Sequence, residues 1–212
     1  MNAMKLTKYQ HSCFTVEKNN EIIVVDPGKY SSDFIAPDKV VAIIITHVHS
    51  DHFDHEQIES IIDKNPEAII FGPQTVTSAI EVFKTQAITE DTTVEVGQFK
   101  LQFILGEHES VRPNFPSTAN LGVMIDDLLY YPGDSFMAPP APVDTLALPA
   151  AAPWLRISDT IDFYLFVRPR LAFPTHDAIL SVEGKEIVDS HLSSVAAENG
   201  IEYKRLDTPV EI

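Results

Sequence analysis

Short apolar runs rich in β-branched residues recur along the chain and predict strands. The run over 40–46, VVAIIIT, is almost entirely apolar, which is typical of a strand buried on both faces. Turn residues such as Asn19-Asn20 and Asp26-Pro27-Gly28 separate the early runs. The pattern predicts strands over residues 5–10, 12–17, 21–25, 40–46, 67–71, 92–96, 99–105, 119–125, 128–131, 143–148, 170–173 and 202–206.

Longer stretches between some of these strands have a helical pattern, over residues 56–63, 74–83, 157–166 and 184–199. Strands and helices alternate near both ends of the chain, and hairpins fill the middle. Six prolines make residues 132–153 mostly loop. No repeat or linker interrupts the pattern, so we expect one α/β domain over residues 1–212.

Composition and charge narrow the class of protein. Apolar residues make up 44% and charged residues 22%, which is a globular composition. The net charge of −16 repels phosphate groups, so we expect no nucleic acid and no membrane as partner. One cysteine, Cys13, excludes a disulfide framework within the monomer. No apolar run approaches the ~20 residues of a membrane-spanning helix, and the first ten residues lack the apolar segment of a signal peptide. We therefore expect a cytoplasmic protein.

Three histidines and one aspartate lie within six residues, directly after the apolar run 40–46: His47, His49, Asp51 and His52. Loops at the carboxyl ends of buried strands are where α/β folds place their sites. Imidazole and carboxylate ligands without thiolates suit zinc, manganese or iron. His47 and His49 can project the same way from an extended segment, while Asp51 and His52 face a second point. The segment therefore predicts two metal ions. Ordinary surface histidines at a helix start would not explain such clustering.

Three more residues of ligand type follow apolar strands: His108, Asp134 and His176. Any one of them alone could be a cap or a surface residue. Together they would lie along one rim of the sheet, where two ions would need further ligands.

The pattern His-x-His-x-Asp-His, followed by a distant His, Asp and His, resembles the metallo-β-lactamase superfamily. Within it, the chain is similar to small single-domain metal-dependent hydrolases, the group that resembles ascorbate-6-phosphate lactonase. The similarity extends over essentially the whole chain and includes the stretches HSCF at 11–14, VDPG at 25–28, NLGV at 120–123 and FPTHD at 173–177.

This resemblance implies an α/β fold with four αββα layers, in which two mixed sheets lie inside and helices outside. It also implies which residues hold each ion. His47, His49 and His108 would bind one ion, Asp51, His52 and His176 the other, and Asp134 would bridge both. The complete set favours an active enzyme over a degenerate relative.

The expected activity is hydrolysis at a dinuclear metal centre with a bridging hydroxide, because bound metal lowers the pKa of water from ~15.7 to about 7. The substrate would be an ester, lactone or phosphodiester of a small polar molecule, and a homo-oligomer is possible in this group. Asp51 could hold the proton of the nucleophile or pass it to the leaving group. A non-catalytic protein that binds a metal or ligand on the same scaffold is the alternative.

Four further residues have two interpretations each. His11 either faces the substrate as a catalytic residue or is hydrogen-bonded within the structure. Asp26 either orients a metal-binding imidazole or caps a turn. Arg112 suits an anionic group or is solvated, and Trp154 forms a pocket wall or anchors a loop.

Overall fold

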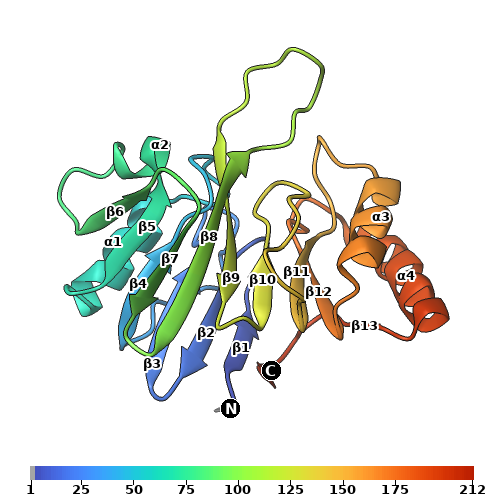
Figure 1. Cartoon of the computed structure of the whole chain (residues 1–212), viewed down its shortest axis with the longest axis horizontal. Helices are drawn as coiled ribbons and strands as arrows, with labels where there is room; N and C mark the ends of the chain where they lie inside the picture. Colours follow the sequence, from blue (N-terminus) through green and yellow to red (C-terminus); the bar gives the residue numbers. More distant parts are fainter. Residues whose placement is uncertain (1–2) are drawn as a thin grey trace.

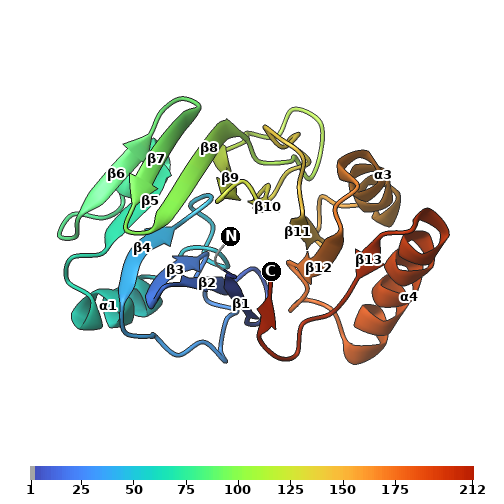
Figure 2. The ribbon, with the colours of Figure 1, turned by 60° about the horizontal axis from the view of Figure 1, so that its bottom comes forward.

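Two seven-stranded β-sheets face each other in the computed structural model, which describes residues 3–212 (Figures 1 and 2). The first sheet has the strand order β14-β1-β2-β3-β4-β5-β6. Its first strands pair antiparallel, and β3, β4, β5 and β6 pair parallel. The strands are β1 (Lys5–Lys8), β2 (Phe14–Lys18), β3 (Glu21–Val25), β4 (Val40–Ile44), β5 (Ile69–Pro73), β6 (Thr85–Ile88) and β14 (Val210–Glu211).

The second sheet has the order β13-β12-β11-β10-β9-β8-β7 and is mixed in the same way. Strands β7 to β10 pair antiparallel, whereas β10 to β13 pair parallel. The strands are β7 (Thr92–Val96), β8 (Phe99–Glu107), β9 (Ala119–Ile125), β10 (Leu129–Tyr131), β11 (Thr145–Pro149), β12 (Leu171–Thr175) and β13 (Glu202–Tyr203).

Helices cover the outer faces of both sheets. Helix α1 (His55–Lys64) packs Ile58 and Ile61 against the outer face of the first sheet. Helices α3 (Ile157–Val167) and α4 (Val182–Asn199) cover the second sheet in the same way. Asp54 caps α1, because its side chain accepts a hydrogen bond from the backbone N–H of Gln57. The resulting four αββα layers confirm the predicted fold class.

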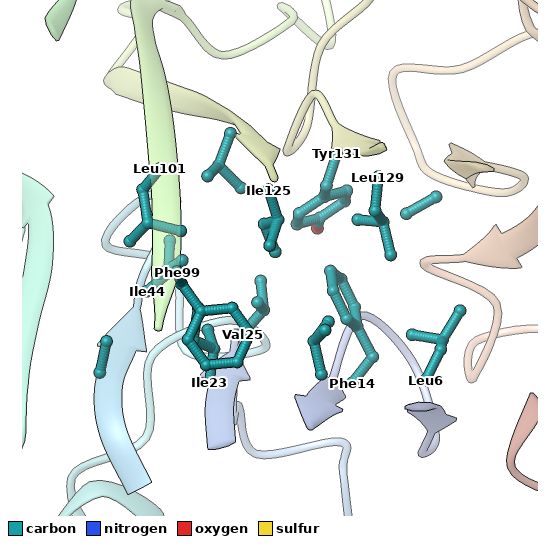
Figure 3. Close-up of a cluster of buried hydrophobic side chains, with 14 of the residues drawn as sticks. Leu6, Phe14, Ile23, Val25, Ile44, Phe99, Leu101, Ile125, Leu129 and Tyr131 are labelled. Atoms are coloured by element: carbon teal, nitrogen blue, oxygen red, sulfur yellow. The ribbon is translucent and has the colours of Figure 1, made fainter. Parts of the chain in front are cut away.

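The space between the sheets is filled by one apolar cluster, part of which Figure 3 shows. Alternate residues of β4 serve two interfaces: Ala42 and Ile44 face this cluster, whereas Ile43 packs beneath α1. The apolar run of β4 therefore follows from burial on both faces. The labelled side chains of Figure 3 are Leu6, Phe14, Ile23, Val25 and Ile44 from the first sheet and Phe99, Leu101, Ile125, Leu129 and Tyr131 from the second.

The prediction of a helix over 74–83 was wrong. Helix α2 is a short turn, Gln74–Thr77, and the chain then bends and forms the edge strand β6. Three β-branched residues, Thr75, Val76 and Thr77, disfavour a longer helix here. The two-residue edge strand β14 was also not predicted. No helix within residues 3–212 is long and apolar enough to cross a membrane.

Candidate metal centre

All seven predicted ligand residues meet at one end of the sandwich. Segment 47–52 follows β4 in the first sheet, and three residues of the second sheet close over it from the ends of β8, β10 and β12. The ligand atoms form three overlapping groups, and within each group they lie within 4.8 Å of one another. His47 and His52 each belong to two groups, so the cluster is continuous.

The first group contains His47, His49 and His108. The ring centroids of His47 and His49 lie 4.7 Å apart, and those of His47 and His108 lie 4.8 Å apart. Hydrogen bonds at Nδ1 set the orientation of two rings. Nδ1 of His47 lies 3.0 Å from Oγ1 of Thr46, and Nδ1 of His108 lies 2.5 Å from the backbone oxygen of Glu109. Donation through Nδ1–H leaves both Nε2 lone pairs free for a metal.

The second group contains His11, Asp51, His52 and His176. Nδ1 of His52 lies 2.7 Å from Oδ2 of Asp26, and Nδ1 of His176 lies 2.6 Å from the backbone oxygen of Ala151. The imidazole Nδ1–H donates in both cases, so Nε2 again faces the cluster. Such outer partners fix the tautomer that a metal requires.

Asp134 lies between the two groups and is 2% exposed. Its Oδ1 is 3.2 Å from Nε2 of His52, and its Oδ2 is 2.9 Å from Nε2 of His176 and 3.3 Å from Nε2 of His108. The indole N–H of Trp154 donates to the same Oδ2 at 3.1 Å. The two oxygens of this carboxylate therefore face both groups.

Three of these convergent atoms are buried without a hydrogen-bond partner among the described residues: Nε2 of His47, Nε2 of His52 and Oδ1 of Asp134. Buried polar atoms without partners are costly and rare in folded proteins. Nitrogen and carboxylate oxygen atoms that converge in this way match the ligand chemistry of zinc, manganese or iron. The donor set therefore fits divalent metal.

The histidines of the two groups differ in the direction of their pKa shifts: the pKa of His47 is lowered, whereas the pKa of His176 is raised. Burial lowers the pKa of His47 well below its usual range, with a further contribution from His52. Burial also acts to lower the pKa of His176, but Asp134 and Asp51 outweigh it and raise this pKa to about 10. The pKa of Asp134 is well below its usual range despite burial, because His52 and His176 favour the carboxylate. Negative charge buried at this point holds protons and would also hold metal cations.

Comparisons with known proteins test the fold and the family of the chain. The structure is similar to that of the metallo-beta-lactamase fold protein YhfI from Bacillus subtilis, with a TM-score of 0.74 and 14% identity over 100% of each chain. Residues 5–176 match the family model described as a beta-lactamase superfamily domain. The chain belongs to the metallo-β-lactamase superfamily.

Two other proteins are similar to this chain in sequence. Protein Rv0786c of Mycobacterium tuberculosis is 31% identical over 198 residues, which cover 91% of this chain and 92% of the relative. A UPF0173 metal-dependent hydrolase of Bacillus cytotoxicus is 38% identical over 74 residues, which cover 33% of this chain and 31% of the relative.

Asp26 is hydrogen-bonded to residues of the candidate metal centre of this superfamily member. Besides His52, its carboxylate accepts hydrogen bonds from the backbone N–H and the hydroxyl of Thr46 and from the hydroxyl of Tyr131. Of the two interpretations of Asp26, this geometry favours the orienting one. Sequence reasoning missed Tyr131, because it lies in an apolar strand and its hydroxyl gives no separate signal.

His11 is fully buried, and both of its ring nitrogens have partners. The backbone N–H of Ala178 donates to Nδ1 at 3.3 Å, so the proton is on Nε2 and is donated to Oδ2 of Asp51 at 3.0 Å. This tautomer makes His11 a partner of Asp51. The backbone φ of His11 is 61°, in the left-handed region that other residues than glycine seldom adopt. Such strained residues concentrate at functional sites.

The remaining candidates lie at the edge of the centre. The exposed Arg112 is stacked over the ring of Phe115, 5.0 Å from its centroid, and is not among the clustered residues. Trp154 contacts Asp134 directly, so it does more than anchor a loop.

Proposed function

We propose that this metal-dependent hydrolase of the metallo-β-lactamase superfamily binds two divalent ions and cleaves an ester, lactone or phosphodiester bond of a small polar molecule. The observation that carries the proposal is the convergence of buried, unpartnered Nε2 and Oδ1 atoms from both sheets. The ligand types favour zinc or manganese, with iron also suitable.

The geometry supports one assignment of the ligands. His47, His49 and His108 would hold the first ion, and His52, His176 and Asp51 would hold the second. Asp134 would serve both, because its two oxygens face both groups. Hydrogen bonds from Nδ1 keep four of the five imidazoles in the required tautomer, those of His47, His52, His108 and His176.

When bound, the ions would supply a hydroxide nucleophile from water and would polarise the bond under attack. The protein's own residues then position and move protons. Asp51 is partly exposed, with 20% of its side chain accessible, so it can meet both the attacking water and the substrate. Its carboxylate can take a proton and pass it to the leaving group. His11 fixes the orientation of that carboxylate through Nε2–H.

Metal stoichiometry tests the proposal first. We expect about two ions per chain by elemental analysis after loading with manganese or zinc and removal of loose ions. His49→Ala should lose metal sharply and abolish hydrolysis of an activated ester or phosphodiester. His49 is exposed, so this variant should fold. Asp134→Ala, which removes the bridging carboxylate, should affect both groups.

His191→Ala is the matched control, because His191 is exposed on α4, away from the centre. It should keep both the metal and the activity. Unchanged metal content and turnover in His49→Ala and Asp134→Ala would contradict the proposal. Full metal occupancy with no turnover across lactones, thioesters and phosphodiesters would favour the non-catalytic alternative.

A further inference from the structure

Loop 108–118 connects β8 to β9 and projects beyond the ends of the strands (Figure 1). Hydrogen bonds tie its base to the metal centre. The backbone N–H of Glu109 donates to the backbone oxygen of Asp134 at 2.9 Å, and the backbone N–H of His108 donates to the backbone oxygen of Thr118 at 2.9 Å. The hydroxyl of Ser117 donates to the backbone oxygen of His108 at 2.7 Å. The base of the loop therefore has a fixed position relative to the proposed ligands.

A cleft of about 130 Å³ lies between this loop and the proposed ligands His49 and His108. Two apolar side chains of the loop line it while remaining half-exposed: Val111 is 49% and Phe115 is 47% exposed. The Arg112 guanidinium stacks on the Phe115 ring and restricts its position. Pro116 adds a third apolar wall.

The residues that line this cleft determine which chemical groups of a ligand can bind there. When a ligand covers apolar side chains beside an open cleft and removes them from water, the free energy of the complex falls. Glu109 is the one acidic residue among those that line the cleft, and neither Lys nor Arg is among them, so the lining offers no basic side chain to pair with an anionic group. The cleft therefore suits an uncharged apolar group and disfavours a phosphate or carboxylate.

We propose that this cleft is a subsite for one compact, uncharged apolar group of the substrate, adjacent to the bond under attack. Its volume sets the size, because a cavity of roughly 150 Å³ accommodates benzene. A single aromatic ring or a short branched alkyl group fits, whereas a long acyl chain extends beyond the loop. This inference rests on the proposed function, since it places the reacting bond at the proposed metal centre.

Binding of hydroxamic acids to the metal-loaded protein tests the subsite without requiring turnover, because the hydroxamate group chelates the metal and its substituent probes the cleft. We expect benzohydroxamate to bind at least about tenfold more tightly than acetohydroxamate, the effect typical of added apolar contacts in a pocket. Succinate monohydroxamate, which carries a carboxylate, should gain nothing. Isothermal titration calorimetry measures all three affinities.

Phe115→Ala should remove most of the benzohydroxamate advantage and leave acetohydroxamate binding and metal content unchanged. Phe166→Ala is the matched control, because Phe166 is also an exposed phenylalanine, 68% accessible, but lies on α3 outside the cleft. It should retain the full advantage. Equal affinities for the aromatic and methyl compounds, or an undiminished advantage in Phe115→Ala, would overturn the subsite.

Measurement of ester turnover distinguishes failure of the subsite from failure of the proposed hydrolase function on which it rests. Hydrolysis of activated esters combined with equal hydroxamate affinities would leave the hydrolase in place and remove the subsite. A benzohydroxamate advantage that Phe115→Ala abolishes, without turnover of any ester, lactone or phosphodiester, would support the subsite and contradict the hydrolase.

Discussion

Trp154 contributes one hydrogen bond to the centre, from its indole Nε1 to Oδ2 of Asp134. Trp154→Phe would remove this donor and keep a ring that can pack against Phe136, whose centroid lies 5.6 Å away. We expect metal affinity to fall by about 10-fold to 100-fold, the usual effect of losing an outer partner of a metal ligand. Titration against a competing chelator measures this change.

Tyr164→Phe provides the control for that variant. It also removes one donor from a half-buried hydrogen bond, here to the backbone oxygen of Glu202, and lies outside the centre. It should leave metal affinity unchanged. Equal affinities of the wild type and Trp154→Phe would show that the indole N–H does not act on Asp134.

At the level of single residues, the sequence was most informative where chemistry is concentrated. His and Asp are conspicuous when they follow apolar strands, so the seven expected ligand residues, all of which cluster, could be predicted. The partners that orient them could not. The imidazoles of His108 and His176 are held by backbone oxygens of Glu109 and Ala151, and every residue type carries such an oxygen.

Between β3 and β4, the turn at residues 26–28 packs directly on segment 47–52, which carries four of the proposed ligands. A Cβ at Gly28 would lie 1.8 Å from the backbone oxygen of Asp51 and 2.4 Å from the backbone nitrogen of His52. Gly28→Ala must therefore push these backbones apart. We expect this variant to lose both metal occupancy and thermal stability, measured by elemental analysis and calorimetry.

Gly200→Ala is the contrasting substitution at the end of α4. Gly200 has a φ of +66° but no atom within 4 Å of an added Cβ. The variant should lose about 1 kcal/mol of stability from its left-handed backbone and keep its metal. Full metal occupancy in Gly28→Ala would show that the turn does not determine the position of the segment.

Helices and strands could be predicted from the sequence where the pattern of apolar residues was clear. The apolar run of β4 indicated burial on both faces, and the packing under α1 and against the second sheet explains it. Edge elements were less clear. β6 is an edge strand with intermediate or exposed residues at three of its four positions, so it lacks the apolar signal that identified the central strands.

The proposed metal centre would also join the two halves of the whole molecule. His47, His49, Asp51 and His52 follow the first sheet, whereas His108, Asp134 and His176 follow the second. Metal that binds only the folded chain should raise its free energy of unfolding, by about 2.7 kcal/mol at a concentration 100 times the Kd. Thermal unfolding in chelator and in excess metal measures the gain.

This gain should increase with pH. In the metal-free protein the pKa of His176 is about 10, against about 6.5 in the unfolded chain. Its protonated form therefore stabilises the metal-free fold fully below about pH 6.5, and this contribution declines as pH rises toward 10. Metal must displace the same proton, so its affinity rises over that interval. A gain that is constant between about pH 6 and about pH 8.5 would contradict this coupling.

Because the proposed ligands come from both sheets, the stability of the chain in a cell would depend on the supply of the metal ion. Chains without metal would keep the apolar core between the sheets but lack the stabilisation that bound ions add, so they would spend more time unfolded, where proteases degrade them. Scarcity of the ion would then reduce the amount of the protein as well as its activity. Its abundance would follow the metal supply even with constant synthesis.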